Sequence, residues 1–77
     1  ERNGRHMTTV PITTEFIKLQ DLLKYQGIAE TGGEAKLMIQ DGTVSVGGAI
    51  CTMRGKKIRP GDIVTVGGED YTVSHAD

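Results

Sequence analysis

Apolar residues recur with a helical period in two neighbouring stretches of the chain. Leu19, Leu22 and Leu23 follow the i, i+3, i+4 spacing of a buried helical face. Gly27 comes next, and glycine readily adopts the left-handed conformation in which many helices end. The spacing therefore predicts a first helix over residues 19–26.

The second helical stretch follows after a connection of only three residues. It opens with Thr-Gly-Gly-Glu at 31–34, a capping box in which the threonine hydroxyl accepts a backbone N–H and the glutamate reaches back. Ala35, Met38 and Ile39 then continue the apolar face, and Gly42 is the glycine that ends the helix. Because the connection is so short, we expect the two helices to pack as a hairpin.

The rest of the chain is typical of short strands, in which apolar and polar residues alternate. Four such strands are predicted, at residues 43–46, 49–52, 63–66 and 71–73. The glycine pairs at 47–48 and 67–68 favour two tight hairpin turns. Residues 59–62, Arg-Pro-Gly-Asp, have the proline and glycine that a type II turn requires at its centre.

Earlier in the chain, residues 8–14 are interpreted as an extended lead-in. Residues 15–18 are interpreted as a short strand that joins the sheet, with Phe16 turned toward the core. At the other end, His75 is placed in a frayed tail. The predicted fold class is α+β: a two-helix hairpin packed on a small, mainly antiparallel sheet of three to five strands.

The length of 77 residues leaves room for one small domain. Residues 1–7 are polar, lack periodicity and end in His-Met, so we interpret them as the remnant of an expression tag. A single domain is then expected over residues 8–77, with its core at about 16–74. Nine Lys and Arg stand against ten Asp and Glu, a net charge of −1. This balance excludes a uniformly basic surface but leaves room for a local basic patch.

Several classes of protein and site are excluded by what the sequence lacks. A single cysteine, Cys51, excludes an internal disulfide framework and favours a reducing, cytoplasmic setting. Apolar runs are too short to cross a membrane. Cys51 and His75 stand alone, so no metal site is expected. Since no nucleophile motif, acid/base pair or cofactor motif is visible either, we expect no catalytic residues, no cofactor and no enzymatic activity.

The basic residues are concentrated in one segment. Four of them lie within six positions, namely Arg54, Lys56, Lys57 and Arg59. Arginine and lysine side chains neutralise phosphates and so supply affinity for nucleic acid that does not depend on sequence. The alternative interpretation is a solvated surface loop.

A second candidate for phosphate binding is the start of the second helix. There Thr31, Gly32 and Gly33 precede Lys36 by about one turn, and the free N–H groups of a helix start attract anions. Alternatively, the two glycines only allow a tight entry into the helix. Aromatic residues make up 4% of the chain, too few for a surface that stacks bases. RNA binding would therefore rely on backbone charge and shape.

Taken in order, the motifs resemble a known family. They are Ile17-Lys18-Leu19, the run Thr31-Gly32-Gly33-Glu34-Ala35-Lys36, the hairpin Val44-Ser45-Val46-Gly47-Gly48, and Lys57-Ile58-Arg59-Pro60-Gly61-Asp62. This order resembles the ribosomal-protein-S-four-type RNA-binding domain, or alpha-L RNA-binding motif, in its small stand-alone bacterial branch. The resemblance covers residues 16–66. It implies structured RNA, ribosomal or transfer RNA, as the partner. We expect a monomer without membrane association that acts in ribosome assembly, with ribosomal particles as a further partner.

The resemblance also implies roles for particular residues. Lys18 occupies the basic position before the first helix, and Thr31 and Lys36 match positions at the start of the second. Gly32 stands where the family often has arginine, so backbone contact would replace that side chain. The residues expected to bind RNA are Lys18, Thr31, Gly32, Gly33, Lys36, Arg54, Lys56, Lys57 and Arg59. The alternative hypothesis is a protein-interaction adaptor that uses the same fold and binds through its glycine-rich hairpins or an edge strand.

Overall fold

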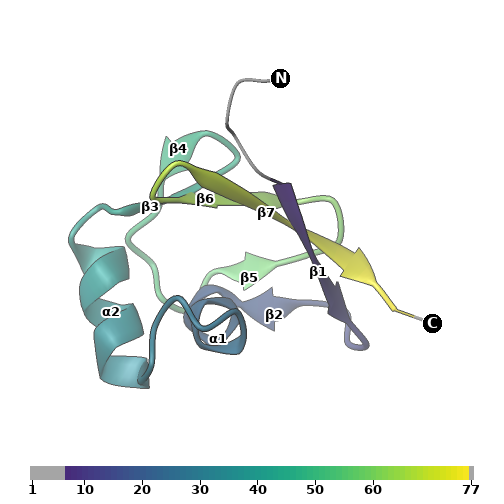
Figure 1. Ribbon diagram of the computed structural model, residues 1–77, viewed down its shortest axis with the longest axis horizontal. Helices are drawn as coiled ribbons and strands as arrows, with labels where there is room; N and C mark the ends of the chain where they lie inside the picture. The colour runs from purple at the N-terminus through teal and green to yellow at the C-terminus, as the bar shows by residue number, and fades with distance from the viewer. Residues whose placement is uncertain (1–6, 77) are drawn as a thin grey trace.

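The computed structural model describes residues 7–76, in which two helices pack beside a five-stranded sheet and a separate two-stranded ribbon (Figure 1). The elements are β1 Met7–Ile12, β2 Ile17–Lys18, α1 Leu19–Tyr25, α2 Gly32–Gln40, β3 Val44–Val46, β4 Ala49–Ile50, β5 Lys57–Ile58, β6 Ile63–Val66 and β7 Glu69–His75. The sheet has the order β1-β7-β6-β3-β4, and β2 pairs with β5. In Figure 1, β3, β4 and β6 lie above the ribbon, β1 runs down beside it, α1 lies at the end of β2 and α2 at the left. The predicted α+β class is confirmed.

Both helices end as their glycines predict. Gly42 has φ 81°, and its N–H donates to the carbonyl of Ile39 at 3.2 Å. The N–H of Thr43 donates to the carbonyl of Met38 at 3.2 Å, which completes a Schellman motif. Gly27 ends α1 in the same way, with φ 74°. The glycine positions therefore set the helix lengths to within a residue of the prediction.

The predicted hairpins are also present. The glycine pairs at 47–48 and 67–68 all have positive φ, as two-residue turns between twisted strands require. They connect β3 to β4 and β6 to β7, which are antiparallel pairs. In the turn at 59–62, Gly61 has φ 98° and the N–H of Asp62 donates to the carbonyl of Arg59 at 2.9 Å. This is the predicted type II turn.

The beginning of the chain differs from the prediction. The expected lead-in at 8–14 is largely strand β1, which lies at the sheet edge and pairs in parallel with β7. Val10 is opposite Val73 and fully buried, so the core begins before residue 16. Met7 is the first residue of β1, and the rest of the proposed tag remnant lies outside the described residues. The parallel pairing was missed because it joins opposite ends of the sequence.

Two further expectations were wrong. The early strand, reduced to β2, does not join the five-stranded sheet but pairs with β5. Lys57 therefore lies in strand β5. His75 is the last residue of β7 and not part of a frayed tail. Pairing with β1 extends β7 beyond its own hairpin and holds this end in the sheet.

The core lies between the helices, the ribbon and the sheet. Its largest fully buried side chains are Leu19, Leu22, Leu23, Ile39, Ile58, Val10, Val44 and Val64. Tyr71 is buried at the sheet, and its hydroxyl donates to Glu69 at 3.0 Å. Burial, together with this hydrogen bond, raises the pKa of Tyr71. Neither α1 nor α2 is long and apolar enough to cross a membrane.

Substitution of Gly42 tests whether α2 ends at this residue. A Cβ added at Gly42 would lie at an ordinary 3.6 Å from Ile50 Cγ2, whereas the φ of 81° is strained for any side chain, so we expect the cost of Gly42→Val to be mainly conformational. We expect the free energy of unfolding to fall by about 1 kcal/mol or more, because valine is strained at positive φ. Chemical denaturation measures this change. Gly32→Ala is the matched control: it lies in helical backbone with open space around it and should not destabilise.

Candidate functional site

The two-stranded ribbon presents an apolar side and a charged side. Ile17 is opposite Ile58, and Lys18 is opposite Lys57. Ile58 is fully buried and Ile17 packs against the core. Because adjacent residues of a strand point to opposite faces, the two lysines share the outer face. The ribbon therefore buries isoleucines on one side and displays cations on the other.

The outer face continues beyond the paired residues. Extending the same register by one step places Phe16 opposite Arg59, both on the side of the lysines. We call this surface the ribbon face; its residues are Phe16, Lys18, Lys57 and Arg59. The predicted orientation of Phe16 toward the core is wrong, because its ring is only half-buried and lies beside the cations of this outer face. The alternation in Phe-Ile-Lys at 16–18 and Lys-Ile-Arg at 57–59 is the pattern that could have revealed this face.

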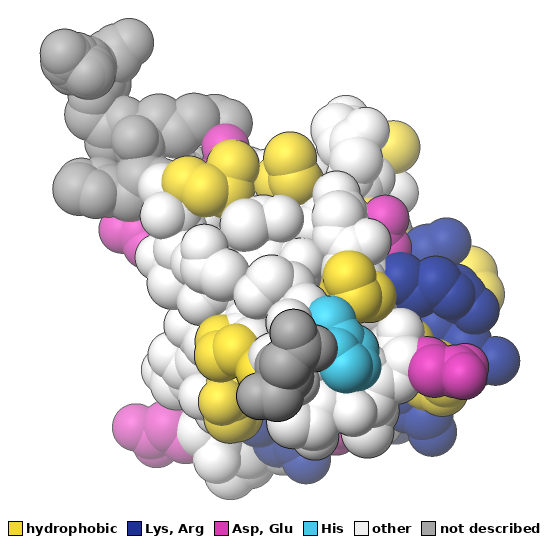
Figure 2. Space-filling view, turned by 90° about the vertical axis from the view of Figure 1, so that its right-hand side faces the viewer, with side chains coloured by type: hydrophobic (Ala, Val, Ile, Leu, Met, Phe, Trp, Pro, Cys, Tyr) yellow, Lys and Arg dark blue, Asp and Glu magenta, His cyan; other side chains and the backbone are white. Residues whose placement is uncertain are grey.

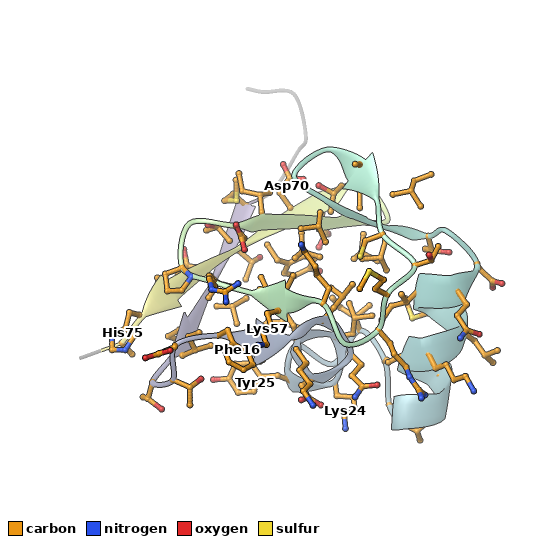
Figure 3. All side chains as sticks on the ribbon, turned by 180° about the vertical axis from the view of Figure 1, so that it is seen from behind. Phe16, Lys24, Tyr25, Lys57, Asp70 and His75 are labelled. Atoms are coloured by element: carbon orange, nitrogen blue, oxygen red, sulfur yellow. The ribbon has the colours of Figure 1, made fainter. Side chains whose placement is uncertain are left out.

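Phe16 lies against two of these cations. The Lys57 ammonium is 4.9 Å from the centre of the ring, and the Arg59 guanidinium carbon is 5.9 Å from it. Figure 3 shows Phe16 and Lys57 together. Both distances are within the range of a cation–π interaction, in which the negative face of the ring attracts the cation. One ring therefore contacts two cations.

Among residues 7–76, no acidic side chain forms an ion pair with a cation of the ribbon face. In the part of the chain that the structure describes, the ion pair is Lys24 with Asp21, 3.5 Å apart on α1. Lys18 and Lys57 instead face each other across the ribbon, and like charges in this position are destabilising. Figure 2 shows lysine and arginine side chains gathered mainly along the right-hand edge of the molecule. The chain therefore concentrates positive charge here despite its net charge of −1.

Residues 53–56, which precede β5 and are called the basic loop here, are hydrogen-bonded to the start of α1. The N–H of Leu19 donates to the carbonyl of Lys56 at 2.9 Å, and the N–H of Gln20 donates to the carbonyl of Arg54 at 3.1 Å. Lys18 occupies the N-cap position of α1, but its side chain makes no hydrogen bond to the N–H groups of the helix start. The loop carbonyls thus satisfy N–H groups that a helix start otherwise leaves free. This argues against a freely moving solvated loop and holds Arg54 and Lys56 beside the ribbon.

The remaining predicted residues lie at the start of α2. The Thr31 hydroxyl accepts from the N–H of Glu34 at 3.1 Å, and the Glu34 carboxylate accepts from the N–H of Glu30 at 2.6 Å. Gly32 and Gly33 are exposed and have room for a ligand to approach their backbone. The two glutamates, however, put negative charge at the same helix start, which weakens its attraction for phosphate.

The nine predicted residues therefore form two groups. Five surround the ribbon and the start of α1, namely Lys18, Arg54, Lys56, Lys57 and Arg59. Four lie on α2 or at its cap, namely Thr31, Gly32, Gly33 and Lys36. Helix α2 packs against α1. No hydrogen bond or ion pair between described residues joins the second group to the basic loop.

Apart from the basic residues, the side chains that could support binding or reaction chemistry are potential metal ligands and Cys51. Between 7 and 76, no three His, Cys, Asp or Glu side chains gather as they would around a metal ion. Cys51 is half-buried, and its Sγ lies 3.8 Å from the carbonyl of Met53. It lines a hollow beside β4 together with Ile50, Met53 and Lys56.

Comparison with known proteins gives one family. The sequence profile of the S4 domain matches residues 10–74. The chain is 40% identical over 57 residues to the Escherichia coli K12 protein named "Putative RNA-binding protein YbcJ", a match covering 74% of this chain and 81% of the relative. The Shigella flexneri protein "Uncharacterized protein YbcJ" matches to the same extent.

The architecture agrees with a solved structure. The solution structure of E. coli YbcJ, described as an alpha-L motif involved in RNA binding, superposes with a TM-score of 0.68 at 33% identity. The match covers 96% of this chain and 95% of YbcJ. Since the S4 profile spans most of the chain and the fold agrees with that of a relative, this protein belongs to the S4-domain family.

Proposed function

We propose that this protein is a non-enzymatic module of the bacterial cytoplasm that binds structured RNA, ribosomal or transfer RNA, and acts in ribosome assembly. The observation that carries the proposal is the ribbon face with its adjoining loop: five cations without acidic partners among residues 7–76. A surface that retains opposed like charges is suited to a ligand that brings negative charge. The RNA-binding descriptions of the E. coli relative and its structure support the same conclusion.

The aromatic residues favour recognition of the RNA backbone over stacking on bases. Tyr71 is buried, Tyr25 is exposed on α1, and Phe16 already contacts two cations. No pair of aromatics lies on the outer side of the described sheet, so the base-stacking platform of sheet-surface RNA-binding domains is missing there. The fixed cations instead fit phosphates whose spacing is set by a folded RNA.

The start of α2 is proposed as a secondary contact. Gly32 and Gly33 offer backbone N–H groups, and Lys36 adds a cation one turn later. Glu30 and Glu34 oppose an anion at this point. We therefore assign the larger share of the affinity to the ribbon face and basic loop.

Lysine substitutions test this division. Lys56→Ala combined with Lys57→Ala should weaken binding to every RNA tested, and the slope of log affinity against log salt should fall by about 1 for each lost phosphate contact. Lys36→Ala should weaken binding less. Filter binding of a labelled RNA stem-loop and of total transfer RNA, repeated from roughly 50 to 200 mM salt, measures both effects.

Lys24→Ala is the matched control, because Lys24 is paired with Asp21 and lies outside the ribbon face. It should bind RNA as the wild type does. Wild-type affinity and salt slope in the double variant would contradict the proposal.

The opposed lysines give a second test, in which affinity and stability move in opposite directions. Lys18→Glu converts a like-charge pair with Lys57 into an attractive one. Stability should rise by roughly 0.2–1 kcal/mol, the usual contribution of a cross-strand charge pair, while RNA affinity falls. Thermal unfolding and filter binding of the same preparation provide the two values. A variant that loses stability, or that keeps full affinity, would show that Lys18 is not retained for binding.

A protein-interaction adaptor is the second candidate function. It is favoured by Ile50 and Met53, which are 67% and 65% exposed beside the short edge strand β4. Both residues line the same hollow, and contiguous exposed apolar surface is typical of protein-interaction sites. The filter assay separates the two candidates, since an adaptor would retain no RNA at any salt concentration.

A further inference from the structure

We propose that Phe16 is a positioning residue for RNA binding: its ring holds Lys57 and Arg59 in place as one preorganised anion-binding pair. This inference rests on the proposed function and assigns a role to a residue outside the predicted basic set. It starts from the two contacts of the ring, 4.9 Å to the Lys57 ammonium and 5.9 Å to the Arg59 guanidinium.

The backbone on both sides of the ring is fixed. The Thr14 hydroxyl donates to the carbonyl of Phe16 at 2.7 Å, immediately before β2. Lys57 is held by its pairing with Lys18. The N–H of Arg59 donates to the Asp62 carboxylate at 2.8 Å, within the type II turn. The flexible parts of this surface are therefore the long side chains of the two cations.

An aromatic ring restrains these side chains without neutralising them. A carboxylate at the same place would also hold a lysine or arginine, but it would cancel the charge that attracts phosphate. A ring attracts the cation through its quadrupole and leaves the net charge unchanged. The nearby Asp62 carboxylate binds the backbone N–H of Arg59 and forms no ion pair with its guanidinium.

The benefit of such restraint is entropic. Lysine and arginine are among the side chains that lose most conformational freedom when they are immobilised in a complex. A ring that already confines two of them lowers this cost for each phosphate contact. The number of phosphates contacted stays the same, so the effect should appear in the affinity and not in its salt dependence.

The test compares Phe16→Leu, which keeps an apolar side chain, with Phe16→Tyr, which keeps the ring. Binding of a fluorescein-labelled RNA stem-loop is followed by fluorescence anisotropy at several salt concentrations. Phe16→Leu should raise Kd about fivefold and leave the slope of log affinity against log salt unchanged. Phe16→Tyr should keep the affinity of the wild type. Thermal unfolding of each variant verifies that it is folded.

A double-mutant cycle separates positioning from a general effect on the fold. In a Lys57→Ala, Arg59→Ala background, Phe16→Leu should have no further effect on Kd. Tyr25→Leu is the matched control, since Tyr25 is an exposed aromatic without a cation–π partner among residues 7–76. It should bind as the wild type does.

Proton NMR of the free protein tests the contact itself. The ring should shift the ε-methylene protons of Lys57 upfield in the wild type and in Phe16→Tyr, and this shift should disappear in Phe16→Leu. Unchanged affinity in Phe16→Leu, or an equal loss in the background without the two cations, would overturn the positioning role while leaving RNA binding intact. A wild-type protein that binds no stem-loop would refute the proposed function and this role with it, even if the shift were present.

Discussion

Two backbone hydrogen bonds join the start of α1 to the basic loop, and the candidate site depends on them. The N–H groups of Leu19 and Gln20 donate to the carbonyls of Lys56 and Arg54. They continue the β2–β5 pairing into the helix and bring together two segments that are distant in sequence. Lys18 is a poor helix cap. The loop performs the capping, which leaves this position available for a cation.

The same arrangement explains how a nearly neutral chain acquires a concentrated positive surface. The isoleucines of the ribbon are anchored in the core, so the residues on either side of them must face outward. Lys18 and Lys57 are thereby held opposite each other at some cost in stability. Folding energy from the apolar side of the ribbon offsets repulsion on its charged side. Such a cost is understandable where a surface serves binding.

Local signals in the sequence predicted much of the fold, whereas long-range pairing was largely missed. Helix ends at Gly27 and Gly42 and the glycine-pair turns follow from backbone preferences of a few residues. Strand β1 contains Pro11 and depends on β7 at the other end of the chain. Strand β5 has only two residues, inside a charged run. The basic residues of the site were visible, and the alternation at 16–18 and 57–59 gives each segment an apolar and a charged side. Their grouping around Phe16 also required the pairing of β2 with β5, two segments that are distant in sequence.

If the ribbon face and basic loop bind RNA as one surface, the backbone amides of both segments should respond to RNA together. NMR titration of the ¹⁵N-labelled protein with an RNA stem-loop measures this response, because each backbone amide gives its own signal. We predict the largest shift changes at residues 16–20 and 54–59, smaller ones at the start of α2, and almost none in β1 and β7. Changes confined to the β4 edge or to the start of α2, with the ribbon unaffected, would contradict binding through this surface.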